Sequence, residues 1–540
     1  MNNIFIKYTG YLSLVALLSA GCTKQFDKIN TNPASYSQSS FDPNYVLTGA
    51  ELGYTGSADF AYDTWRANLI YCSTMMQGFS TVIGYWAGDK YMLNPVYTAA
   101  YWGFDNGFNG SVNGDCAYPE QIKPIVDVVE STIGKDQYKN LHQIARILRV
   151  LMLQRITDLY GDCPYFNAGM GYYNKDFFPK YDAQDSIYMD MLKEVSDATA
   201  QLDPTADQAP GDVIYTGAGK IAQWQRFGNS LILRIAMRLC KVDPNTAKTY
   251  IQAVVGKTFI DNTDNAYVLG DATGGRPTQN RNSQILLGDG GQENFYTRWS
   301  NTFINMLKNA NDPRLGKVAV TNLYVNENTK IQNPSYNATA SVQKGMPNGL
   351  DFSTPGHIVS SDTTFTAFTD YSSPNPAMIK RNGPTFILTY AETELLWADA
   401  AARFGIGGDP AAHYHSGLVA SMTYLSQYDP SIAIDPTTAE NYAIANPYNA
   451  ADGLEMINNQ YWLHTCTNLD FYECWCNYRR SGFPTLTQIN FPGNATGGTI
   501  PRRFPYPLGE ADTNPENYQA AHNAVPGGDL LTSRVWWDKQ

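Results

Sequence analysis

The densest group of residues suited to recognition chemistry is a run of aromatic side chains between residues 60 and 108. This stretch holds thirteen aromatic residues and only five charged ones. Flat rings can stack on the apolar C–H faces of sugars, and nearby Asn, Asp and Tyr groups can hydrogen-bond the sugar hydroxyls. Some of these rings stand among glycine, proline and asparagine, in sequence typical of loops, and loops lie on the surface. The rings predicted to bind ligand are Tyr85, Trp86, Tyr91, Tyr101 and Trp102.

Two alternatives apply to parts of this run. Tyr62, Trp65 and Tyr71 fall where one face of a helix would bury them, so we expect them in the core. The loop rings themselves could do no more than pack loops together. Tyr296 and Trp299, close after a glycine-rich loop that ends at Gly291, form a second candidate ligand site.

Catalytic motifs are missing from the sequence. It has six histidines, no G-x-S-x-G elbow and no H-E-x-x-H zinc motif. Gly256-Lys257-Thr258 is similar to the end of a phosphate-binding loop, but the position of the required first glycine is Ile251. We therefore expect a protein that is not an enzyme and needs no cofactor. A secreted carbohydrate-active enzyme stays the alternative, because a pair of facing carboxylates has no sequence signature. Turnover assays on likely polymers would separate the two.

A cluster of His464, Cys466, Cys474 and Cys476 has the residue types of a metal site. It lies in a stretch that reads as helix, where residues two apart point about 200° away from each other. Cys474 and Cys476 could then not face one ion. We expect these cysteines to be buried as small apolar residues and expect no metal.

Composition narrows the class of protein. The 540 residues carry a net charge of −12, and only 16% of them are charged, whereas 13% are aromatic. A nucleic acid is thus not expected as the partner, because phosphate recognition needs clustered Lys and Arg. Tyrosine is too abundant to fit in a core, so we expect a polar surface poor in charge.

The N-terminus predicts export. Lys7 precedes the apolar stretch 11–20, which is too short to span a bilayer and is typical of a secretory signal. It ends in Leu18-Ser19-Ala20-Gly21-Cys22, which resembles a bacterial lipobox. We predict a signal peptide at 1–21, lipidation of Cys22 and a flexible tether after it. The alternative is an ordinary signal in which Cys22 is incidental.

Periodic apolar residues predict helices separated by long irregular loops. The expected helices cover 137–160, 187–202, 223–239, 297–307, 385–404, 410–425 and 462–480. Asp409 and Pro410 provide an N-cap and a first-turn proline, so 385–425 should form a helical hairpin of tetratricopeptide type. Arg479 and Arg480 fall in a last helical turn, where we expect them to pair inside the protein rather than to contact a partner. Loops as long as 261–294 and 322–384 are usually functional or separately folded.

Eight short segments resemble, in order, the signatures of one bacterial family. They are Phe26–Pro33, Thr157–Tyr165, Trp224–Arg238, Asp312–Arg314, Leu388–Glu392, Glu473–Pro484, Ile500–Arg503 and Trp536–Asp538. On these motifs the chain is identified as a member of the SusD/RagB group, nutrient-binding lipoproteins of the outer membrane of Bacteroidetes. The chain differs from the family's motifs at Cys163, Cys474 and Ser481. These are small or apolar substitutions, so they leave the fold prediction unchanged.

The resemblance implies a mainly α, SusD-like fold over residues 22–540, with tetratricopeptide-like hairpins, long loops and a few short strands. It also implies a surface-exposed lipoprotein, anchored by lipid in the outer membrane. Such a protein captures an oligosaccharide or polysaccharide and delivers it to a SusC-like TonB-dependent transporter. RagB-like members handle peptides, so a peptide is the alternative ligand. The sequence leaves open which ligand is bound, how the seven other cysteines pair and whether a structural Ca²⁺ is held.

Overall fold

Packed helices dominate the computed structural model, which describes residues 41–58, 61–103, 117–326 and 332–539. By its internal contacts the chain divides into two units, Met1–Pro43 and Asn44–Gln540. The fold described below is that of the second unit. Cys22, the signal peptide and the tether lie outside the described residues, as do Cys116 and the aromatic residues Phe60, Phe104 and Phe108.

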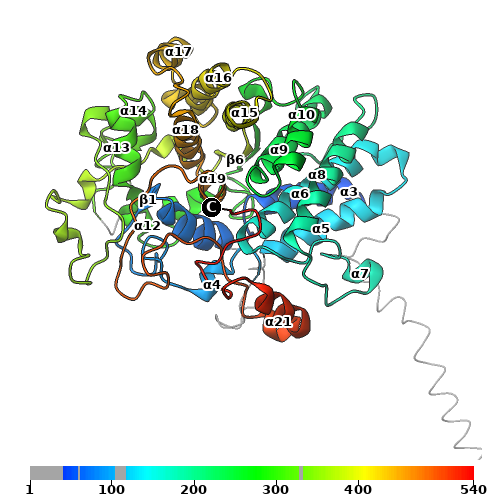
Figure 1. Ribbon diagram of the computed structural model, residues 1–540. Coiled ribbons are helices and arrows are strands. Elements are labelled where there is room, and N and C mark those ends of the chain that lie inside the picture. The colour runs from blue at the N-terminus through cyan, green and yellow to red at the C-terminus, as the bar shows by residue number, and fades with distance from the viewer. Residues whose placement is uncertain (1–40, 59–60, 104–116, 327–331, 540) are drawn as a thin grey trace, which may run out of the picture. The chain divides into compact units, whose positions relative to one another are not determined.

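One group of helices comes from the first half of the chain. Its members are α5 (Ala117–Thr132), α6 (Lys139–Tyr160), α8 (Gln184–Gln201), α9 (Lys220–Arg238) and α10 (Pro244–Ala253). Each packs on the next in this order (Figure 1). Gly161 ends α6 with a φ of 87°, a backbone conformation that favours glycine. The predicted helices 137–160, 187–202 and 223–239 are confirmed with small shifts at their ends.

A second group comes from the later part of the chain. It holds α15 (Tyr390–Phe404), α16 (Pro410–Thr423), α17 (Pro436–Ala445), α18 (Gly453–Thr467) and α19 (Phe471–Ser481). The Asp409 side chain accepts a hydrogen bond from the Ala411 N–H, so the predicted N-cap is confirmed. Helix α15 packs on α16 and α18, and α18 packs on α19. These pairs confirm the predicted helical hairpins.

Three helix predictions are wrong in part. The residues before Thr389 belong to strand β6 (Pro384–Leu388), because they pair with β2 (Ala266–Leu269) and Thr389 then caps α15. The predicted helix 462–480 is two helices, because Leu469 turns with a φ of 59° and the Asp470 side chain caps α19. The predicted helix 297–307 begins later, as α13 (Asn301–Asn309), since residues 298–299 form strand β3.

The remaining elements are short. Besides β2 and β6, β1 (Phe79–Ser80) pairs with β3 (Arg298–Trp299), and β4 (Ala319–Val320) pairs with β5 (Ser373–Pro374), all antiparallel. Residues Thr64–Ser73 form a buried π-helix. The other α-helices are α3 (Pro43–Tyr54), α4 (Pro95–Thr98), α7 (Gly171–Asn174), α11 (Arg281–Leu286), α12 (Glu293–Tyr296), α14 (Leu315–Val318), α20 (Glu510–Thr513) and α21 (Pro515–Ala524).

Buried ion pairs join the two groups of helices. Arg234 of α9 bonds Glu392 of α15 through two contacts of 2.6 and 2.7 Å, and both side chains are buried. Arg238, also on α9, pairs with Glu473 of α19 and lies 3.6 Å from Asp158 of α6. One helix is thus bonded to three others through charges that have no access to water.

The predicted cysteine cluster and arginine pair are both internal. Cys466, Cys474, Cys476 and His464 are buried, and the Cys466 and Cys474 sulfurs lie 4.0 Å apart. Burial as small apolar residues is therefore confirmed. Arg480 bonds Asp399 at 2.9 Å, and Arg479 donates to the Arg502 carbonyl and lies over the Trp475 ring, which confirms internal pairing for both arginines.

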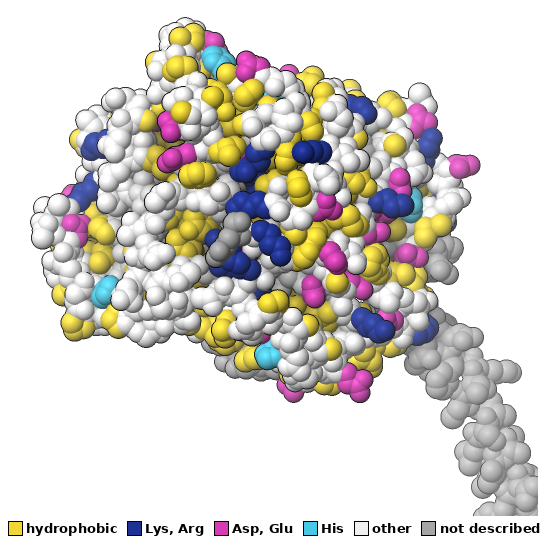
Figure 2. Space-filling model, in the orientation of Figure 1, with side chains coloured by type: hydrophobic (Ala, Val, Ile, Leu, Met, Phe, Trp, Pro, Cys, Tyr) yellow, Lys and Arg dark blue, Asp and Glu magenta, His cyan; other side chains and the backbone are white. Residues whose placement is uncertain are grey.

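The visible surface is mostly uncharged, as the composition predicts. Figure 2 shows wide areas of polar and hydrophobic atoms, with Lys and Arg side chains gathered around the C-terminal end of the chain. None of the helices within the described ranges is long and apolar enough to cross a membrane.

Candidate functional site

Six of the seven predicted ligand-binding rings are buried, so the expectation that they are exposed is wrong for them. They are Trp86, Tyr91, Tyr101, Trp102, Tyr296 and Trp299, each with at most 5% of its surface exposed. The rings of Tyr62, Trp65 and Tyr71 are buried too, as predicted. A ring without an exposed face cannot stack on a ligand, so these six cannot form a stacking platform.

Tertiary contacts account for this burial. Trp102 stacks on Tyr181 at 5.4 Å and meets the edge of Tyr160 at 5.3 Å, while Tyr101 lies under the Arg155 guanidinium at 4.6 Å. The Trp299 indole stacks on Phe303 at 4.1 Å, and its N–H donates to the Val318 carbonyl. The alternative interpretation, in which loop rings pack loops together, holds for these residues.

Tyr91 and Trp86 lie on the same loop as Tyr85 and are fully buried. The Tyr91 hydroxyl accepts a hydrogen bond from the Ile489 N–H at 3.4 Å. The Trp86 carbonyl accepts one from the Lys90 ammonium at 2.9 Å. Tyr85 therefore stands on a loop whose neighbouring side chains hold it in place.

Tyr85 is the one predicted ring with a substantial exposed surface, 42% of its area. Its hydroxyl donates a hydrogen bond to the carboxylate of Glu293, the first residue of α12. Burial, and then the charge of Glu293, raise the pKa of Tyr85, so the phenol stays protonated and keeps donating.

Tyr296, at the other end of α12, meets a second exposed ring. Its ring packs edge-to-face against Phe352 and Phe368, with both pairs of ring centres 5.0 Å apart. Phe352 has 54% of its surface exposed. We call Tyr85, Glu293, Tyr296 and Phe352 the aromatic loop site.

Glu293 gives this site a hydrogen-bond acceptor. The side chain is buried, and its Oε2 atom has no partner among the described residues, although its Oε1 accepts from Tyr85. An unpaired buried acceptor is costly, so it is suited to a donor brought by a ligand. The exposed rings of Tyr85 and Phe352 match the apolar faces of a sugar, and the carboxylate bonded to Tyr85 matches its hydroxyls.

Phe352 and Glu293 were missed by reasoning from the sequence. Both lie in the long loop segments 261–294 and 322–384, whose length was the available signal. Phe352 is also an isolated ring in a stretch rich in glycine, serine and threonine.

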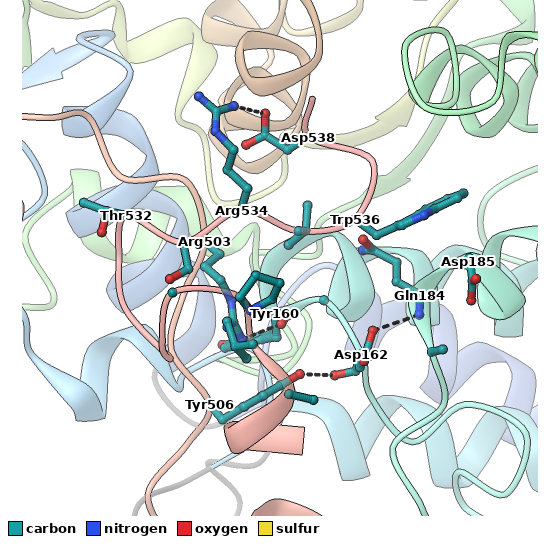
Figure 3. A pocket seen from close by; sticks show the side chains of 18 of the residues that line it. Tyr160, Asp162, Gln184, Asp185, Arg503, Tyr506, Thr532, Arg534, Trp536 and Asp538 are labelled. Carbon is teal, nitrogen blue, oxygen red and sulfur yellow. Dashed lines mark hydrogen bonds and ion pairs between the residues drawn. The ribbon is translucent and has the colours of Figure 1, made fainter. Parts of the chain in front are cut away.

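A cavity of about 720 Å³ lies elsewhere, beside the C-terminal segment. Its wall consists of residues 160–162 at the end of α6, 183–185 at the start of α8, and 503, 506, 524–527, 532–536, 538 and 539. Figure 3 shows Arg503, Tyr506, Gln184 and Trp536 around it. We call this cavity the C-terminal pocket. None of its lining residues belongs to the aromatic loop site.

A family profile described as starch-binding and associating with the outer membrane matches residues 61–507. The chain belongs to the SusD-like family. This SusD-like chain is identified by a match that covers most of its length, which confirms the resemblance carried by the sequence motifs.

Solved structures agree with this assignment. A chitin-binding protein is 28% identical to this SusD-like chain, with a TM-score of 0.77 over 92% of this chain and 100% of the other. A SusD-like protein from Bacteroidetes is 24% identical, with a TM-score of 0.75 over 93% and 100%. A SusD homologue from Bacteroides thetaiotaomicron VPI-5482, at 22% identity, has a TM-score of 0.68 over 93% and 100%. The predicted SusD-like, mainly α fold is therefore confirmed.

No curated protein gives a significant match to this SusD-like chain.

Proposed function

We propose that this SusD-like protein captures a glycan at the aromatic loop site and delivers it to a SusC-like TonB-dependent transporter. The observation that carries the proposal is the pair of exposed rings at the two ends of α12: Tyr85 bonds the buried carboxylate of Glu293, and Phe352 packs on Tyr296. The family's description as starch-binding and the likeness to a chitin-binding protein support a carbohydrate as the ligand. In this proposal the chain binds the glycan without cleaving it.

Binding of maltohexaose and chitohexaose, measured by isothermal titration calorimetry, tests the site. We expect Tyr85→Ala and Phe352→Ala each to weaken binding at least tenfold, because each removes one stacking face. Tyr85→Phe keeps the ring and should lose less binding affinity than Tyr85→Ala. Phe178→Ala is the matched control, since this ring is 63% exposed but lies outside the site. Equal affinities for all four variants and the wild type would contradict the proposal.

A peptide is the alternative ligand, and a screen against a peptide mixture separates the two. Peptide binding that depends on Tyr85, without glycan binding, would replace the glycan in this proposal. Release of reducing sugar ends from either hexasaccharide would instead show an enzyme.

The partner and the anchor belong to the same proposal. Cys22 would carry the lipid that holds the protein on the outer face of the outer membrane. Co-purification from a mild detergent extract tests the transporter: a large barrel protein should accompany the chain, and its absence would count against delivery through such a partner.

A further inference from the structure

The wall of the C-terminal pocket contains two buried polar atoms that lack partners within the described part of the chain. Gln184 Oε1 is an acceptor without a donor, although the same amide donates to the Thr157 carbonyl at 2.7 Å. Arg503 Nε is a donor without an acceptor, although its guanidinium also bonds the Tyr160 carbonyl at 2.6 Å. Both side chains are buried and fixed by these other bonds. A pocket with one unused donor and one unused acceptor is suited to a ligand with hydroxyl groups.

Aromatic surface accompanies these polar atoms. Tyr160, Tyr506 and Trp536 line the same cavity, and in Figure 3 the Gln184 side chain extends toward the Trp536 ring. The Arg503 guanidinium lies 4.6 Å from the centre of the Tyr506 ring. Behind them, Trp102 packs on Tyr160 and Tyr506 and keeps their rings in place.

Two cations of the pocket are paired with carboxylates. Arg503 lies 3.0 Å from Asp529, and Arg534 bonds Asp538 at 2.7 Å. On the opposite wall, Asp162 accepts the Gln184 backbone N–H at 2.9 Å. A ligand with a net charge would disturb these pairs, whereas a neutral polar ligand would leave them intact.

We propose that the C-terminal pocket is a second carbohydrate site, which takes a short neutral oligosaccharide separately from the aromatic loop site. Its volume lies in the range of small-molecule pockets, roughly 300–1,000 Å³. The proposal rests on the proposed function for its ligand class. In it, a glycan captured by the exposed rings has a further place on the same protein where one of its ends can bind.

Hydrogen–deuterium exchange of the whole mature protein in detergent tests this proposal, with maltotriose and chitotriose as probes. We expect at least one trisaccharide to slow exchange in peptides that cover 524–539. Ala183→Trp should abolish this protection, because residue 183 is an exposed position on the pocket's wall where a bulky ring would fill the cavity. Ala402→Trp, at an exposed position of α15, is the matched control and should leave the protection unchanged.

Two further outcomes separate this proposal from the proposed function. Tyr85→Ala should remove protection from peptides around residues 81–92 while leaving that of 524–539 intact. Protection confined to 524–539 in the wild type would contradict the aromatic loop site and support the pocket. No protection of 524–539 by either probe, or protection that survives Ala183→Trp, would overturn the second site.

Discussion

At the scale of single residues, His464 shows how far burial changes chemistry in this chain. Its Nε2 atom lies 2.6 Å from the Thr389 hydroxyl, in a wholly buried position. Burial, and then the charge of Arg314, lower the pKa of His464 to about 3. The imidazole is therefore neutral in the folded protein over most of the acid range, whereas in the unfolded chain it takes up a proton below about pH 6.5.

This difference predicts that the protein becomes less stable as the pH is lowered. Because the unfolded state binds the additional proton, the free energy of unfolding decreases as the pH drops from about 6.5 toward 3, and the contribution at pH 4 is about 3 kcal/mol. Urea unfolding at pH 7 and pH 4 measures it. His464→Gln should reduce the pH dependence by this amount. The same pH dependence in the wild type and His464→Gln would refute this account.

At the scale of elements, capping residues decide where helices begin. The Asp409 carboxylate accepts the Ala411 N–H at 3.0 Å and lies at the surface, so little else depends on it. We expect Asp409→Ala to lower the free energy of unfolding by about 1 kcal/mol, and Asp409→Asn by only a fraction of that. Chemical denaturation with a common slope measures both. A loss in Asp409→Asn as large as that in Asp409→Ala would show that the side-chain cap is not the cause.

The same elements show what sequence could predict. The regular spacing of apolar residues located α6, α8 and α9, because each of these helices buries one continuous apolar face. It failed at Thr385 and Leu469, where strand pairing and a cap from Asp470 override a helical pattern. Tyr85 and Trp86 are neighbouring aromatic residues in the same stretch of sequence, yet only Tyr85 is exposed. Which ring is covered depends on the distant residues packed over the loop, and no local pattern carries that information.

At the scale of the whole molecule, Arg238 links helices that lie far apart in the sequence. It pairs with Glu473 and approaches Asp158, and all three side chains are fully buried. Arg238→Met would remove the ion-pair partner of the buried Glu473 and the nearest cation of the buried Asp158, so we expect a loss of roughly 3–5 kcal/mol in the free energy of unfolding. Arg238→Lys keeps the positive charge and should lose less of the free energy of unfolding. Thermal and urea unfolding check both variants, and a stable Arg238→Met protein would contradict the role of this network.

Anchoring is a further property of the whole molecule. If Cys22 carries the lipid, Cys22→Ala should move the protein into the soluble fraction, because the apolar stretch 11–20 is too short to span a bilayer. Cell fractionation with a carbonate wash measures this, and Cys72→Ala, at a buried cysteine, serves as the control. A Cys22→Ala protein that stays with the membrane after the wash would exclude the lipobox.

The central claim is that the exposed rings of the aromatic loop site hold a glycan. A crystal structure of the protein soaked with maltohexaose or chitohexaose tests it most directly. We expect sugar rings stacked on Tyr85 and Phe352, with a sugar hydroxyl donating to Glu293 Oε2. Crystals in which the sugar binds only elsewhere, or in which neither hexasaccharide binds, would contradict it.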